Sequence, residues 1–238
     1  MNIVIDLGNT RVKYAIYLDS VLQKLEYSLE NLICDLEQNK EKTINILLSG
    51  SGNIDNIDTV QLKKYSSTLI KSSDIENFPL SFGYSNRREC GFDRIADCVG
   101  ALTLKPRKPL LVIDAGTCIT YNYIDATSCF LGGNISPGVD IRFKSLNDYT
   151  HKLSLVKAQT PFGGIANNTH DSILNGVLQG ILFEIQAYLS HFRSENPDGE
   201  IIITGGSSKF FIDKLSDDII FIEDLGFRGL NQLLILNS

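Results

Sequence analysis

The stretch Asp6-Leu7-Gly8-Asn9-Thr10 follows the apolar run Ile3-Val4-Ile5, and a related stretch, Asp114-Ala115-Gly116-Thr117, follows Leu110-Leu111-Val112-Ile113. Each copy has the pattern of a buried strand, a tight turn and a second strand. The first strand brings a carboxylate to its end, the glycine permits a sharp turn, and the hydroxyl or amide side chains can donate hydrogen bonds to an anion. One copy alone fits an ordinary hairpin turn, but two copies half a chain apart indicate a duplication.

The composition excludes several classes of protein. The 238 residues carry a net charge of −6 and no Lys/Arg cluster longer than Arg87-Arg88 or Lys63-Lys64, so nucleic acid is not an expected partner. No leader with basic and apolar regions precedes the first strand, and polar residues interrupt the apolar segment from Ile173 to Phe192, so neither a signal peptide nor a membrane span is predicted. The five cysteines lack Cys-x-x-Cys spacing, which favours reduced thiols in a cytoplasmic protein.

The pattern of predicted strands and helices repeats in the two halves. The first half reads as strands at 2–6, 11–17 and 21–28, then helix, strand and helix, which is the βββαβα order of the ribonuclease-H-like domain. A segment with two prolines, Lys105 to Pro109, marks the boundary. We therefore predict an α/β fold of two duplicated ribonuclease-H-like domains, residues 1–108 and 109–238, each a mixed sheet with helices, with a cleft between them.

Three further segments have features of ligand-binding loops. Asp93 and Arg94 fall in the first turn of a helix, on the side away from its apolar stripe. The glycine-rich stretch 132–138 precedes a predicted helix from Val139, whose N-terminus would attract an anion. Thr204-Gly205-Gly206 ends a strand before a predicted helix at 207–215 and suits a flat ligand such as adenosine. Each segment taken alone also fits a plain loop or a helix cap.

These features favour phosphoryl transfer. The sequence contains no Gly-x-x-x-x-Gly-Lys-Ser/Thr and no Gly-x-Gly-x-x-Gly, so neither a P-loop nor a dinucleotide site is supported. Transfer of a phosphoryl group needs cations that screen the phosphates, donors that stabilise charge, and a base. Asp6 or Asp114 can hold a cation, and Asp93 can act as the base, which requires that all three carboxylates converge on one pocket between the halves.

The chain resembles the type III pantothenate kinases of the acetate kinase, sugar kinase, heat-shock and actin superfamily. The resemblance rests on five motifs in matching order and spacing along the whole chain: Asp-Leu-Gly-Asn-Thr at 6–10, Gly-Phe-Asp-Arg at 91–94, Asp-Ala-Gly-Thr-Cys-Ile-Thr at 114–120, Gly-Gly-Asn-Ile-Ser-Pro-Gly at 132–138 and Thr-Gly-Gly at 204–206. It implies an ATP-dependent phosphorylation of pantothenate, the first step of coenzyme A synthesis.

The resemblance also implies roles for individual residues. Asp93 would be the proton acceptor, and Asp114 would bind a monovalent cation, K⁺ or NH4⁺, while Mg²⁺ would arrive with ATP and meet Asp6 through a phosphate. Thr169 would reach pantothenate from the neighbouring subunit of a homodimer. The ATP-binding set would be Asp6, Leu7, Gly8, Asn9, Thr10, Arg11, Val12, Lys13 and Thr117. The pantothenate-binding set would be Tyr84, Gly91, Phe92, Asp93, Arg94 and Thr169.

Two other functions are compatible with the same fold. One is a non-catalytic regulator or accessory factor, because a fold does not fix a function. The other is a kinase for a different small hydroxyl compound. Retention of both Asp93 and Arg94 argues against the regulator, since a protein without catalysis has no need of a base beside an anion anchor.

Overall fold

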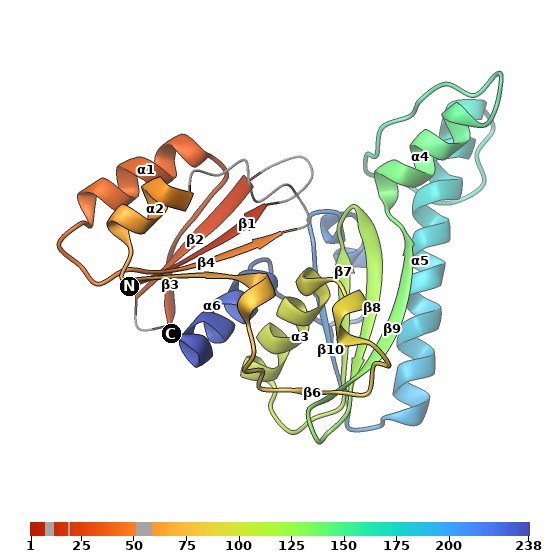
Figure 1. Ribbon diagram of the computed structural model, residues 1–238. Coiled ribbons are helices and arrows are strands. Elements are labelled where there is room, and N and C mark those ends of the chain that lie inside the picture. The colour runs from red at the N-terminus through yellow and green to blue at the C-terminus, as the bar shows by residue number, and fades with distance from the viewer. Residues whose placement is uncertain (8–11, 19, 51–58) are drawn as a thin grey trace. The chain divides into compact units, whose positions relative to one another are not determined.

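The computed structural model describes residues 1–7, 12–18, 20–50 and 59–238, which form two compact units (Figure 1). Unit 1 comprises Met1–Pro106 together with Asp224–Ser238, and unit 2 comprises Arg107–Glu223. The C-terminal segment, which the sequence assigned to the second half, belongs to unit 1.

Unit 1 is built on a mixed sheet with the strand order β3-β2-β1-β4-β5. The strands β1, β2 and β3 pair antiparallel, whereas β4 and β5 continue the sheet in parallel from β1, as a βββαβα chain requires. The elements are β1 (Asn2–Leu7), β2 (Val12–Leu18), β3 (Val21–Glu26), α1 (Leu29–Gln38), β4 (Asn45–Gly50), α2 (Thr59–Tyr65), β5 (Thr68–Lys71), β6 (Ser81–Phe82), α3 (Phe92–Leu104) and α6 (Leu225–Asn237), with 3-10 turns η2 (Ser72–Asp74) and η3 (Arg87–Glu89).

The sheet of unit 1 has helices on both faces. Alternate residues of β1, β2 and β4 form one core with α1 and α2, in which Ile5, Tyr14 and Leu36 are fully buried. On the other side, α6 contacts β1, β2 and β4 and packs along α3. A Cβ on Gly229 would overlap the carbonyl of Ala96, so these helices touch through their backbones. This close packing explains why the last helix belongs to unit 1.

Unit 2 repeats the plan with strands in the order β11-β10-β7-β8-β9. The long helix α5 packs on β7 and β8 through an apolar face that includes Leu178, Ile181 and Ile185. The elements are β7 (Leu110–Ala115), β8 (Cys118–Ile124), β9 (Cys129–Pro137), α4 (Val139–Asp148), α5 (Thr169–Glu195), β10 (Glu200–Thr204), β11 (Ile220–Phe221) and 3-10 turns η4 (Ser208–Phe210) and η5 (Ile212–Lys214).

Two predicted elements of unit 2 are wrong in detail. The segment 132–137, expected to be a glycine-rich loop, continues strand β9. Gly133 lies so close to β8 that a Cβ would overlap the carbonyl of Tyr121, so the glycine serves strand pairing. The helix expected at 207–215 is instead the pair of 3-10 turns η4 and η5, which are joined at the buried Phe211.

Two general expectations can be compared with the described residues. None of their helices combines the length and apolar character that crossing a bilayer requires. All five cysteines are free thiols in this structure, and two of them, Cys90 and Cys98, are buried.

Candidate functional site

In unit 1, the carboxylate of Asp6 lies at the end of β1, directly opposite Lys13 on β2. Burial raises the pKa of Asp6 above its ordinary value; the charge of Lys13 lowers it, and the charge of Asp93 raises it further. Asp93, far away in the sequence, is therefore close enough to act on Asp6. Of the expected ATP-binding residues between these strands, Leu7 and Val12 end the paired region, while Gly8, Asn9, Thr10 and Arg11 lie outside the described residues.

Asp93 stands in the first turn of α3, after Gly91 as N-cap. Its side chain is exposed, and its Oδ1 accepts a hydrogen bond of 2.8 Å from the backbone N–H of Arg94. A Cβ on Gly91 would overlap this carboxylate, so the glycine leaves room for it. Arg94 itself is only 5% exposed. The expectation that both side chains face away from the helix core is wrong for Arg94, which is buried with the apolar residues of α3.

The segment before α3 is held by aromatic packing. The Phe78 ring lies edge-on to Phe82 and Phe92, with centroids 5.4 and 6.5 Å away. The guanidinium of Arg87 lies 4.7 Å from the centroid of Phe78. Tyr84, between β6 and η3, is half-buried within this segment. Four of the residues expected to bind pantothenate, at positions 84, 91, 92 and 94, thus belong to one packed segment that leads into α3.

In unit 2, Asp114 lies near the end of β7, paired in register with Thr204 of β10. Gly205 follows with φ +93°, a conformation that residues with a Cβ rarely adopt. A Cβ at this position would overlap both Oδ1 of Asp114 and the backbone of Ala115. The N–H of Ser207 then donates to the carbonyl of Ala115 at 2.9 Å. The Thr-Gly-Gly motif therefore wraps directly around the Asp114 carboxylate.

The turn after Asp114 meets a second glycine segment. The N–H of Gly138, the N-cap of α4, donates to the carbonyl of Thr117 at 3.1 Å. A Cβ on Gly138 would overlap the carbonyls of Gly116 and Thr117. The Thr117 side chain is exposed beside this contact. Three motifs that are distant in the sequence, at 114–117, 138 and 204–206, thus meet at one end of the sheet. We call these residues the glycine cradle.

A pocket of about 480 Å³ adjoins the glycine cradle. Its wall combines aromatic rings with three lysines from separate elements, one each from α4, the segment after α4 and η4. Sequence reasoning missed these lysines because they do not form a cluster along the chain. The lining is Asp140, Phe143, Lys144, Leu155, Val156, Lys157, Ala158, Gly206, Ser207, Lys209 and Phe210. Flat apolar rings beside ammonium groups can accommodate a base and an anionic group together.

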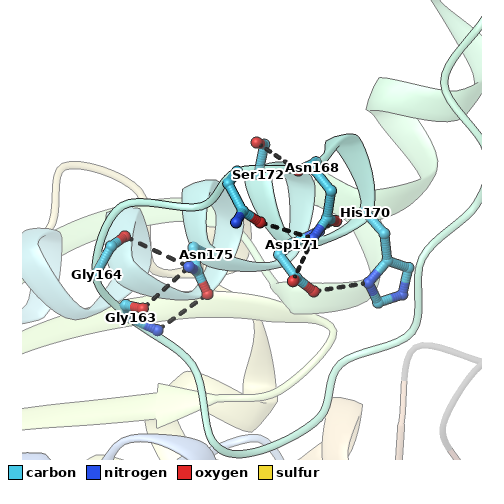
Figure 2. A network of polar contacts seen from close by, with 8 residues as sticks. Gly163, Gly164, Asn168, His170, Asp171, Ser172 and Asn175 are labelled. Carbon is cyan, nitrogen blue, oxygen red and sulfur yellow. Dashed lines mark hydrogen bonds and ion pairs between the residues drawn. The ribbon is translucent and has the colours of Figure 1, made fainter.

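Thr169 is the first residue of α5, and its side chain is exposed. Polar contacts among Asn168, Asp171 and Asn175 hold the loop-to-helix junction around it (Figure 2). Oδ1 of Asn168 accepts from the N–H of Asp171 at 2.9 Å and caps the helix. The Asn175 amide binds both the N–H and the carbonyl of Gly163 at 3.0 Å, which ties the preceding loop to the helix, as Figure 2 shows. The junction is therefore ordered within unit 2.

No three His, Cys, Asp or Glu side chains cluster as a metal cage anywhere in the described ranges. The donor set at the end of β7 is one carboxylate, Asp114, with the backbone of Ala115 and Gly205 close by. A single carboxylate suits a hard, weakly held cation and does not suit Zn²⁺.

The sequence of this chain is similar to that of one family of known proteins. The family model described as type III pantothenate kinase matches residues 2–191. A type III pantothenate kinase of Phocaeicola vulgatus is 36% identical, over 100% of this chain and 99% of that protein. A solved structure from Campylobacter jejuni, described as a conserved candidate transcriptional activator of the Baf family, has a TM-score of 0.64 and 24% identity over 99% of this chain and 98% of that one.

A second solved structure, described as a candidate 2-dehydro-3-deoxygalactonokinase from Sinorhizobium meliloti, has a TM-score of 0.58 and 14% identity, covering 98% of each chain. At these sequence identities the two solved structures support the fold assignment alone. That fold is the α/β architecture with two related mixed sheets described above.

Proposed function

The chain belongs to the type III pantothenate kinase family, and from that membership we propose how its residues carry out the family's reaction. The enzyme is a phosphotransferase that uses ATP with a divalent metal ion to phosphorylate pantothenate in coenzyme A synthesis. The products are ADP and 4'-phosphopantothenate. Such a transfer depends on positioning and electrostatics, so the protein must screen the phosphates, orient the hydroxyl group and accept its proton.

Asp93 is the proposed base. The hydroxyl oxygen of pantothenate forms a bond to the γ-phosphorus, the bond from that phosphorus to the ADP oxygen breaks, and the hydroxyl proton passes to the Asp93 carboxylate. The observation that carries this proposal is that the charge of Asp93 helps to raise the pKa of Asp6, so Asp93 lies within electrostatic reach of the end of β1 although it belongs to the first turn of a helix. An exposed carboxylate beside a phosphate-binding strand end is suitably placed for this role.

The proposed ATP-binding residues belong to both hairpins. Residues 6–13 hold the phosphates, with Lys13 supplying positive charge opposite Asp6. Thr117 donates to a phosphate from the turn that Gly116 and Gly138 keep compact. The nucleoside occupies the pocket next to Gly206, where aromatic rings and lysines line the wall. These contacts would bind an anion in a chain whose net charge is −6.

Pantothenate carries a carboxylate, and the proposed anchor is Arg94. A buried guanidinium makes a strong charge-assisted hydrogen bond with a carboxylate because little water competes. Gly91 and Phe92 shape the site at the start of α3, and Tyr84 contributes from the segment that Phe78 packs. Thr169 is proposed to complete the site from a neighbouring subunit of a homodimer.

Two cations fit the proposed site. Mg²⁺ bound to ATP would be held by the phosphates and Asp6, and K⁺ or NH4⁺ would be held by Asp114. When bound, these ions neutralise phosphate charge. Asp6 is half-buried with a raised pKa, which means that its ionised form is poorly compensated in the protein alone. Because the reaction uses ATP and feeds coenzyme A synthesis, we place the enzyme in the cytoplasm.

The test is a direct assay with ATP, Mg²⁺, K⁺ and pantothenate, following ADP and phosphopantothenate together. Asp93→Asn should lower kcat by roughly 10²-fold or more, which is what a positioned base contributes. The matched control is Asp74→Asn, which removes an exposed carboxylate of unit 1 that accepts a hydrogen bond from Ser73. The control should keep normal turnover.

Near-normal turnover of Asp93→Asn would show that another group acts as the base, and Asp114 is the next candidate. A panel of acceptors, including sugars and other small hydroxyl compounds, separates pantothenate kinase from a kinase of different specificity. A wild-type protein that phosphorylates none of them would support the regulator.

A further inference from the structure

Arg142 of α4 is the centre of a polar cluster that the family motifs do not include. Its Nε donates to the carbonyl of Pro137 at 2.8 Å, and its Nη2 donates to Oγ of Ser136 at 2.8 Å. The same Nη2 forms an ion pair of 2.5 Å with Glu184 on α5. One guanidinium thus joins the end of strand β9 to two helices.

Hydrogen bonds keep the Glu184 carboxylate ionised and in place beside the Arg142 guanidinium. Its Oε1 accepts a second hydrogen bond, of 2.9 Å, from the hydroxyl of Tyr121, whose ring stacks on Tyr188 at 3.7 Å. Burial disfavours the charged carboxylate, but hydrogen bonds from Arg142, Tyr121 and Ser136 outweigh it and lower the pKa of Glu184. About a quarter of each side chain is exposed, 23% for Arg142 and 25% for Glu184, so the pair is partly shielded from water.

The Arg142 cluster acts on the glycine cradle through a short run of backbone. Pro137 and Ser136 pair in register with Cys118 and Ile119, the first residues of β8. The next residue, Gly138, donates its N–H to Thr117 and has no space for a Cβ against the turn. A displacement of the Pro137 carbonyl therefore moves Gly138, and with it the turn that presents Thr117.

We propose that Arg142 is a positioning residue for ATP: its contacts with Pro137 and Ser136 fix the end of β9, and this keeps Thr117 oriented toward the phosphates. The inference rests on the proposed function, because it takes Thr117 as a phosphate contact. Glu184 holds the guanidinium in place and contributes mainly to stability. Arg142 touches neither substrate and acts only through the backbone.

Two conservative variants separate positioning from simple stabilisation. Arg142→Lys retains a cation that can pair with Glu184 but loses the planar fork that reaches two further acceptors at once. We expect KM for ATP to rise about tenfold, the scale of one lost charge-assisted hydrogen bond, with KM for pantothenate unchanged within about twofold. Glu184→Gln leaves the contacts of Arg142 with Pro137 and Ser136, so it should lower the melting temperature with KM for ATP within about twofold of wild type.

The matched control is Arg193→Lys. Arg193 lies on α5 and, like Arg142, pairs with a carboxylate and a serine, Asp218 at 2.6 Å and Ser216 at 2.9 Å, but it contacts no part of the glycine cradle. Its KM for ATP should equal that of the wild type. Ser136→Ala, a smaller change at the same strand end, should raise KM for ATP in the same direction as Arg142→Lys, which provides a second measurement if the lysine variant folds poorly.

Unchanged KM for ATP in both Arg142→Lys and Ser136→Ala would overturn the inference. An equal rise in Glu184→Gln would also overturn it, because the ion pair and not the contact with Pro137 would then orient the turn. A wild-type enzyme that fails to phosphorylate pantothenate is a different result, since it refutes the proposed function. Direct titration of wild-type and variant proteins with MgATP keeps the two failures distinct.

Discussion

Replacing Gly205 by alanine tests whether the Asp114 carboxylate sits in a cradle that only glycine can form. Gly205 has φ +93°, and an added Cβ would overlap Asp114 and the backbone of Ala115. Forcing an L-residue into a left-handed conformation costs about 1–2 kcal/mol, and overpacking a tight site costs about 1–3 kcal/mol more. The expected loss is therefore about 2–5 kcal/mol, since a backbone neighbour cannot move away as a flexible side chain can.

Thermal unfolding provides the first measurement. For a chain of this size each kcal/mol shifts the melting temperature by roughly 2–4 °C, so Gly205→Ala should lower it by roughly 4–20 °C. Gly206→Ala is the control, because a Cβ there meets nothing within 4 Å, and it should stay within about 0.5 kcal/mol of wild type. The Gly205 variant should also lose affinity for MgATP. Equal melting temperatures for the two variants would refute the reasoning about the cradle.

Two predictions concern charge. Since burial raises the pKa of Asp6, its ionised form destabilises the folded protein at neutral pH, and Asp6→Asn should raise the melting temperature at pH 7. This gain in melting temperature should vanish below the ordinary pKa of 3.8, whereas affinity for MgATP should fall roughly tenfold or more. A lower melting temperature of Asp6→Asn at pH 7 would contradict the reasoning. The lowered pKa of Glu184 has the opposite effect on stability. The ionised Glu184 carboxylate stabilises the fold above the ordinary pKa of 4.5, and this stabilisation is lost as pH falls through the lowered pKa. The gap in melting temperature between wild type and Glu184→Gln should therefore be full at pH 7 and close in acid, and a gap independent of pH would show that the charge is not responsible.

The strands were the most predictable part of the fold. Ile3-Val4-Ile5 and Leu110-Leu111-Val112-Ile113 are fully buried strands, as uninterrupted apolar runs before a turn indicate. The extension of β9 through Pro137 was not predictable, because paired glycines signal a loop locally, and only the proximity of Tyr121 shows that Gly133 serves strand pairing.

The helices show a second limit of prediction from sequence, which concerns side-chain burial and helix packing. The periodicity of α3 was correct, yet the burial of Arg94 was missed, because an arginine in a first turn is expected to face solvent. Likewise, α6 follows unit 2 in the chain but packs on α3 through Gly100 and Gly229. Contacts of this kind depend on which surfaces fit together, and a one-dimensional pattern of apolar residues does not record them.

For this protein, the sequence alone determined the duplicated α/β plan, the family and the identity of the candidate residues, because motif order and apolar periodicity are local properties of the chain. Tertiary structure decided which motifs meet: it brought Gly138 and Gly205 against the Asp114 turn, coupled Asp93 to Asp6, and linked Arg142 to Pro137 and Glu184. The physical reason is that these contacts join backbone and charged groups from distant segments, and their free energies depend on distance and burial, which exist only in the folded chain.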